Sequence, residues 1–100
     1  MIDPNNQSVA PFEVSLTKQA QKEFLTLPIS LQAATADVIT ELKLYGNTLT
    51  ESEVKSFNNG LKELRAKSRE GISRSFFFFM KGKRAYIVHI FQKKTQKTPK

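Results

Sequence analysis

Apolar residues near the start of the chain alternate with polar ones and then change to helical spacing. Residues 12–16 read FEVSL, and their alternation predicts a short strand. From Thr17 onward the apolar positions recur every three to four residues, and this pattern ends at Pro28. A short amphipathic helix is therefore expected directly after the first strand.

A second helix is predicted after Pro28. Ser30 is expected to cap its start, and Gly46 followed by Asn47 is expected to end it. Two helices joined at a proline predict a helical hairpin, and the polar segment 47–56 reads as a connector. The apolar stripe of the second helix consists of Leu31, Ala34, Val38, Leu42 and Tyr45.

Three strand-like runs follow, because β-branched and aromatic residues dominate between turn signals. They span residues 61–66, 72–80 and 83–91, with turns at 68–71 and 81–82. Connections this short join neighbouring antiparallel strands, so the runs predict a three-stranded meander. The order of elements predicts an α+β fold, in which two N-terminal helices pack on a small antiparallel sheet.

The middle run has apolar side chains on both of its faces. One interpretation is a well-filled aromatic core, and the other is a sheet face that docks a partner. The two predicted faces are Ile72, Arg74, Phe76, Phe78 and Met80 on one side, and Ser73, Ser75, Phe77 and Phe79 on the other.

Composition limits the classes of protein and site. A chain of 100 residues fits one small domain, expected over residues 12–100, behind a flexible arm at 1–11. With no cysteine and a single histidine, neither a disulfide framework nor a zinc site is expected. No signal peptide or bilayer-spanning run is apparent, which predicts a cytoplasmic protein that does not associate with membranes.

The chain carries a formal charge of +7, which favours a polyanionic partner, although surplus lysines also serve solubility. Arg65, Arg74, Lys93 and Lys94 are set into or just after the predicted meander. Cations of this kind suit stabilisation of the phosphorane in RNA cleavage by the 2′-hydroxyl. The alternatives are an exposed salt bridge or a solvated surface for the arginines and a solvated tail for the lysines. His89 alternates with apolar neighbours, so it is interpreted as a core histidine, with a catalytic role as the alternative.

Three motifs in this region resemble the RelE/ParE superfamily of bacterial toxins, in particular its phage-derived HigB-like branch. They are GLKELR at residues 60–65, ISRSFFFF at 72–79 and IVHIFQKKTQKTP at 87–99. The resemblance implies a RelE-like fold and a type II toxin that inhibits translation as a metal-independent, cofactor-free endoribonuclease cutting mRNA on the ribosome.

The resemblance also implies roles for individual residues. Arg74 and Lys94 match positions that contact the phosphate in the transition state, and Arg65 matches a position that orients the substrate or raises the basicity of the site. The residues expected to contact RNA or the ribosome are Lys62, Lys67, Arg69, Lys93 and Lys97.

Partners and alternatives follow from the same resemblance. The expected partner is a cognate antitoxin of the helix-turn-helix type, in a homodimer or a toxin–antitoxin hetero-oligomer, with the ribosome and mRNA as targets. Family members usually continue into a C-terminal helix, which is expected to be absent here. The alternative functions are a ParE-like gyrase poison and a catalytically inactive module that binds RNA or antitoxin.

Overall fold

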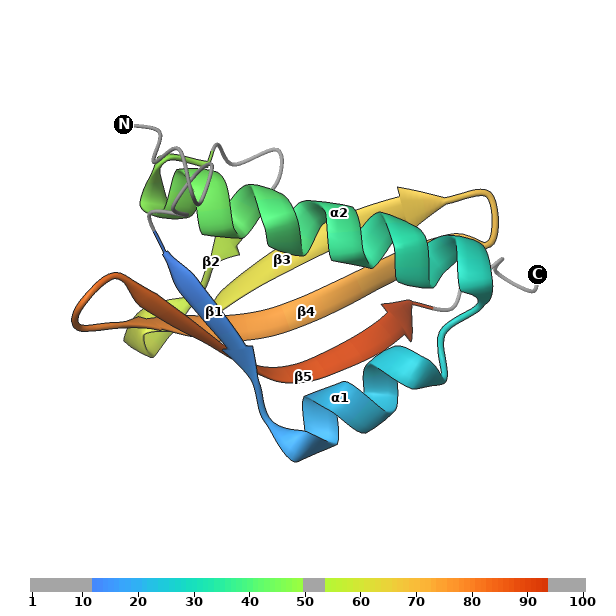
Figure 1. Cartoon of the computed structure of the whole chain (residues 1–100), viewed down its shortest axis with the longest axis horizontal. Helices are drawn as coiled ribbons and strands as arrows, with labels where there is room; N and C mark the ends of the chain where they lie inside the picture. Colours follow the sequence, from blue (N-terminus) through green and yellow to red (C-terminus); the bar gives the residue numbers. More distant parts are fainter. Residues whose placement is uncertain (1–11, 50–53, 94–100) are drawn as a thin grey trace, which may run out of the picture.

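Two helices pack on a five-stranded sheet in the computed structural model, which describes residues 12–49 and 54–93. Figure 1 shows α2 crossing the sheet over β3 and β4, with α1 alongside β5. This arrangement confirms the predicted α+β class. The elements are β1 (Glu13–Leu16), α1 (Lys18–Leu25), α2 (Ile29–Tyr45), the 3-10 turn η1 (Gly46–Thr48), β2 (Val54–Ser56), the 3-10 turn η2 (Asn58–Gly60), β3 (Lys62–Ser68), β4 (Gly71–Met80) and β5 (Arg84–Lys93).

The strands lie in the order β1-β5-β4-β3-β2. The antiparallel meander of β3, β4 and β5 is confirmed, including both short turns. The sheet as a whole is mixed, because β1 reaches β5 through the two-helix segment and pairs with it in parallel. Strand β2 lies within the segment expected to be a connector, and its three residues are too few for a recognisable alternation.

Each helix begins and ends through a local contact. The Thr17 hydroxyl caps α1 by accepting a hydrogen bond from the Ala20 amide at 2.9 Å. The prediction that Ser30 caps α2 is wrong, since Pro28 occupies the cap position and Ser30 lies within the first turn. Its hydroxyl donates instead to a carboxylate oxygen of Glu70, in the β3–β4 turn, at 2.5 Å. Helix α2 ends as predicted at Gly46, where φ is +52°.

The helices contact different parts of the sheet, although they follow one another through a turn at Pro28. Helix α1 packs mainly on β5, and α2 packs mainly on β3. The pair therefore spreads across the sheet, with each helix covering its own strand. Neither helix in the described part of the chain has the length and apolarity needed to cross a lipid bilayer.

The core lies between the helices and one face of β3, β4 and β5. Phe77 is fully buried there, together with Leu31, Leu64 and Ile87. Its neighbours on the same face of β4 include Ser73 and Ser75, also buried, which confirms the predicted alternation of this strand. The Ser73 hydroxyl is paired with that of Thr35 on α2 at 2.6 Å.

No described helix lies against the opposite face of the sheet, which we call the open face. It carries the side chains of Ile72, Arg74, Phe76, Phe78 and Met80 on β4, the set predicted to point away from the serines. Phe78 and Met80 are exposed by 36% and 50%. An antiparallel meander therefore presents a second, partly apolar surface beside the core.

Candidate functional site

Basic side chains converge on the open face because of the strand register. Arg65 on β3 pairs directly with Arg74 on β4, and Lys93 on β5 pairs with Ile72 on β4. Residues paired across a sheet point to the same face, so Arg65 and Arg74 share the open face with Lys93 and, two residues along β3, with Lys67. These four residues, the open-face cations, come from three adjacent strands.

A buried carboxylate holds one of these cations. Glu63 on β3 is 2% exposed, and its two oxygens accept hydrogen bonds from Arg74 Nε at 2.6 Å and Arg74 Nη2 at 3.3 Å. This hydrogen-bonded pair raises the pKa of Arg74, although partial burial acts against it. Because Nε and Nη2 are used, Nη1 is the guanidinium nitrogen left to face a ligand. Glu63 therefore fixes the direction of the Arg74 guanidinium.

Aromatic rings lie beside the cations on the same face. The Phe76 ring contacts Phe91 at a centroid distance of 5.9 Å and Phe57 at 6.2 Å. The Arg74 guanidinium lies 5.4 Å from the Phe76 centroid, within reach of a cation–π interaction. Phe91 is 46% exposed, so part of its ring surface is available to a partner. Cations next to exposed rings are the combination used to bind single-stranded nucleic acid.

His89 is not a core residue, and that interpretation is wrong. A β-bulge between Phe76 and Phe77 leaves Val88 of β5 without a partner, and this extra residue reverses the alternation of the strand. Ile87 before the bulge is buried, whereas the side chain of His89 after it is 49% exposed. His89 pairs with Phe76, so it lies on the open face.

Glu23 of α1 reaches β5 beside His89. Its Oε1 accepts a hydrogen bond from the Ile90 amide at 2.8 Å and lies 3.4 Å from His89 Nδ1. Burial acts to raise the pKa of Glu23, but the Ile90 amide, the Gln19 side-chain amide and His89 together lower it below its usual value. A charged carboxylate is thereby kept beside the imidazole.

The remaining predicted residues are not all part of this group. Lys62 points to the opposite face from Arg65, and its Nζ donates to Ser56 Oγ at 2.9 Å. Arg69 is exposed in the turn between β3 and β4, beyond the paired strands. Lys94 and Lys97 lie outside the described residues.

Two carboxylates of the site, Glu63 and Glu23, are not among the residues predicted from the sequence. Alternation along β3 places Glu63 on the same face as Arg65, so the signal was present in the ELR of the GLKELR motif. Nothing comparable marks Glu23, because its contact depends on how α1 packs against β5. Across residues 12–49 and 54–93, no three His, Asp or Glu side chains are grouped so that they could hold a metal ion.

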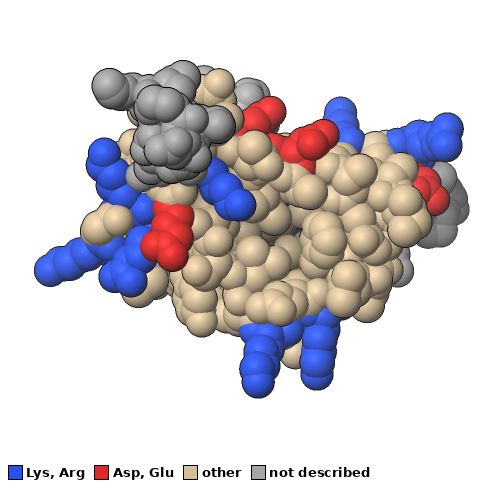
Figure 2. Space-filling view, viewed as in Figure 1, with Lys and Arg blue, Asp and Glu red and all other residues tan. Residues whose placement is uncertain are grey.

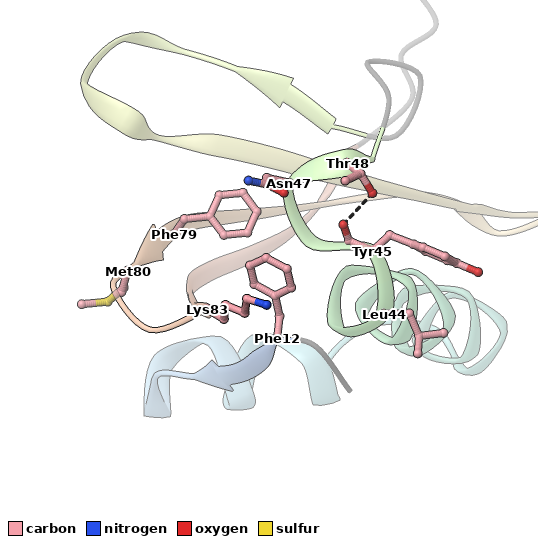
Figure 3. Close-up of a pocket in the computed structure, with 8 residues that line it drawn as sticks. All are labelled: Phe12, Leu44, Tyr45, Asn47, Thr48, Phe79, Met80 and Lys83. Atoms are coloured by element: carbon pink, nitrogen blue, oxygen red, sulfur yellow. Dashed lines mark hydrogen bonds between the residues drawn. The ribbon is translucent and has the colours of Figure 1, made fainter. Parts of the chain in front are cut away.

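Two of the hollows among the described residues adjoin the sheet at different ends. One, of about 560 Å³, lies between the end of α2 and the β4–β5 turn, and Figure 3 shows Phe12 and Phe79 facing each other within it. Its largely apolar lining is remote from the open-face cations. The other, of about 470 Å³, runs along β3 and is lined by Val38, Arg65, Ala66, Lys67 and Ile72. We favour the second as part of the site because two of the open-face cations line it.

The charge on the helix side is distributed differently. Figure 2, which views the molecule from the side of α2, shows Lys and Arg at the margins and mostly uncharged side chains over the centre. Leu25 and Ile29, at the turn between the helices, are among the exposed apolar residues. The strand register places the open-face cations on the opposite side of the sheet from α2.

Comparison with solved structures identifies RelE toxins as structurally similar. A chain of the archaeal RelE–RelB complex from Pyrococcus horikoshii is 21% identical with a TM-score of 0.60, and the match covers 82% of this chain and 94% of that one. A chain of the RelBE2 toxin–antitoxin complex from Mycobacterium tuberculosis is 16% identical with a TM-score of 0.63, covering 86% and 95%. A mutant of Escherichia coli RelE in the free state is 14% identical with a TM-score of 0.60, covering 84% of each chain.

Sequence comparison identifies the family. No curated protein matches the chain significantly. The model of the family described as "Phage derived protein Gp49-like" matches residues 22–100, which include the open-face cations and the three motifs. Family and fold together confirm the predicted resemblance. The chain belongs to the phage-derived Gp49-like family and has the fold of the RelE toxins.

Proposed function

We propose that this protein is the toxin of a type II toxin–antitoxin system and cuts mRNA on the ribosome, in the cytoplasm. The observation that carries the proposal is the convergence of Arg65, Lys67, Arg74 and Lys93 on one face of a RelE-type sheet. Four cations from three adjacent strands form a phosphate-binding surface, and the exposed Phe91 ring beside them is suited to stacking on a base.

The proposed chemistry is attack of a ribose 2′-hydroxyl on the adjacent phosphorus. Negative charge accumulates on the phosphorane oxygens, and preorganised cations stabilise that charge more than they stabilise the ground state. Arg74 suits this role because Glu63 already fixes its guanidinium, so little ordering remains when substrate binds. Arg65, directly opposite, orients the same phosphate. Lys94 follows β5 directly in the chain and is proposed to contact the phosphate too.

A cognate antitoxin is the proposed regulatory partner. The RelE proteins of Pyrococcus horikoshii and Mycobacterium tuberculosis were solved in toxin–antitoxin complexes. For this chain, an acidic segment laid across the open face would be complementary in charge to the open-face cations and would bury the exposed Phe91. Binding there would exclude mRNA directly.

The test is primer-extension mapping of one mRNA incubated with the protein, with and without ribosomes stalled on it. We expect cuts in the ribosomal A site in the presence of ribosomes only. Arg65→Ala should lower the cleavage rate about 10²-fold, as expected for loss of one preorganised transition-state contact. Lys67→Ala and Lys93→Ala should weaken binding to ribosomes in a salt-dependent manner.

Lys62→Ala is the matched control, because it removes the same charge from the other face of the same strand. Equal loss in Lys62→Ala and Lys67→Ala would show that net charge, and not the open face, determines binding. Folded protein that cuts no mRNA with or without ribosomes would refute the nuclease proposal and leave inhibition of gyrase supercoiling as the next assay.

A further inference from the structure

We propose that His89 is the general base of this reaction and that Glu23 is its positioning residue. The inference rests on the proposed function, since it names the group that removes the 2′-hydroxyl proton. Arg65 and Arg74 are suited to stabilising charge, but arginine does not exchange protons at any relevant pH. An imidazole on the same face supplies the missing function.

The contact with Glu23 determines which nitrogen of His89 takes the proton. Glu23 Oε1 lies 3.4 Å from Nδ1, so the neutral ring carries its hydrogen on Nδ1 and leaves the lone pair on Nε2. The carboxylate is itself anchored, because Oε1 accepts from the Ile90 amide at 2.8 Å and Oε2 accepts from Gln19 Nε2 at 3.1 Å. It also stabilises the imidazolium that forms when Nε2 accepts a proton.

Stacking fixes the plane of the imidazole. The rings of His89 and Phe91 are nearly parallel, with an interplanar angle of 14° and a centroid distance of 5.4 Å. Phe91 is in turn held edge-to-face by Phe76. The histidine is thus constrained on two sides, by a carboxylate at its edge and a ring on its face, while the side chain stays 49% exposed.

The strand register places His89 near Arg74 on the open face. Arg74 pairs with Phe91 and Phe76 pairs with His89, so His89 and Arg74 are diagonal neighbours on one face. Diagonal neighbours on adjacent strands are about 7–8 Å apart, with their Cβ atoms somewhat closer. The Arg74 guanidinium is turned toward Glu63 on β3, so the Phe76 ring lies between it and His89 on β5. A phosphodiester laid across this ring would place its phosphate on the guanidinium and its 2′-hydroxyl toward the imidazole.

The proposed step is balanced without a further reactant. His89 Nε2 takes the proton of the 2′-hydroxyl, and the 2′-oxygen forms a bond to phosphorus while the bond to the 5′-oxygen breaks. The 5′-oxygen takes a proton from water, and the imidazolium returns its proton to solvent. The products are a 2′,3′-cyclic phosphate and a 5′-hydroxyl end.

The experiment measures single-turnover cleavage of mRNA on stalled ribosomes across the pH range, for the full chain and variants. We expect His89→Ala to cleave about 10²–10⁴-fold more slowly than the parent, and added imidazole to restore part of the rate. Glu23→Gln should retain a smaller part of the activity, since the carboxylate that orients the imidazole is lost while Arg74 remains. Lys22→Ala, an exposed neighbour on the same helix, should behave as the parent.

His89→Asn serves where His89→Ala fails to fold, because its side-chain amide lies near the position of Nδ1 and can still donate to Glu23. Both variants are expected to lose the pH-dependent limb of the rate profile. Parent-like rates in both variants, from a parent that cuts, would overturn the role of His89 and leave the proposed nuclease function intact. Slow cleavage with an unchanged pH profile and no rescue by imidazole would also overturn it, because a structural role predicts that result. A folded parent that does not cut would overturn both proposals.

Discussion

Breaking the Glu63–Arg74 pair should have unequal effects on stability depending on which partner is removed. Arg74→Ala leaves the Glu63 carboxylate, 2% exposed, without its two charged donors. An unpaired buried charge costs about 3–5 kcal/mol in the free energy of unfolding. Glu63→Gln leaves a guanidinium that is 38% exposed and can be hydrated, so its cost should be only about 1–2 kcal/mol.

Urea unfolding followed by circular dichroism measures both values at neutral pH. The double variant Glu63→Gln, Arg74→Ala should be more stable than Arg74→Ala alone, because it no longer contains the unpaired buried carboxylate of Glu63. Equal costs for the two single variants, or a cost below about 1 kcal/mol for Arg74→Ala, would refute the reasoning and indicate that the carboxylate is hydrated in solution. The same series separates the loss of a catalytic cation from the loss of folded protein in any Arg74 variant.

Further predictions concern acid stability, a buried hydroxyl pair and a helix end. Because the pKa of Glu23 in the folded protein is lowered from 4.5, its contribution to the free energy of unfolding is complete above about pH 4.5 and is lost as pH falls through the folded value. Glu23→Gln should therefore make the free energy of unfolding, measured in urea titrations, less dependent on pH in this acid range. Thr35→Val leaves the Ser73 hydroxyl without its hydrogen-bond partner and should lower the free energy of unfolding by about 1–3 kcal/mol. When Ser73→Ala is added, the total loss should be smaller than the sum of the two single losses. Gly46→Ala should lower the free energy of unfolding by at least about 2 kcal/mol, since φ is +52° and the new Cβ would lie 1.9 Å from Phe12 Cε1. Adding Phe12→Ala removes this clash and should recover part of the lost melting temperature.

The elements that the sequence predicted well are those governed by local rules. Gly46 ended a helix, and the alternation of β4 separated buried Ser73 and Phe77 from Arg74 and Phe76 because side chains in a strand alternate regardless of context. Strand β2 and the parallel pairing of β1 were missed, since both depend on contacts between segments distant in the chain. Local periodicity carries no information on which edge such a strand joins.

The candidate site was predicted in part for the same reason. Arg65, Lys67, Arg74 and Lys93 share a face because alternation and register agree across the meander. Lys62 is predicted to contact RNA from the resemblance alone, although the alternation of side chains along β3 places it on the other side of the sheet. The roles of all these residues, and those of Lys94, Arg69 and Lys97, stay predictions until tested by cleavage.

The bulge at Val88 divides β5 into two segments that are under different constraints. Before it, the strand is bound by β1 on its edge, and Ala85 and Ile87 are buried in the core. After it, Ile90 and Gln92 lie on the inward face, paired with buried Ser75 and Ser73, while His89 and Phe91 face outward. Loss of this single residue would keep the composition nearly unchanged but exchange the two surfaces, hiding the imidazole and exposing an isoleucine. A one-residue deletion here would therefore be more damaging than most substitutions, because the length of β5 at this point determines which side chains form the open face.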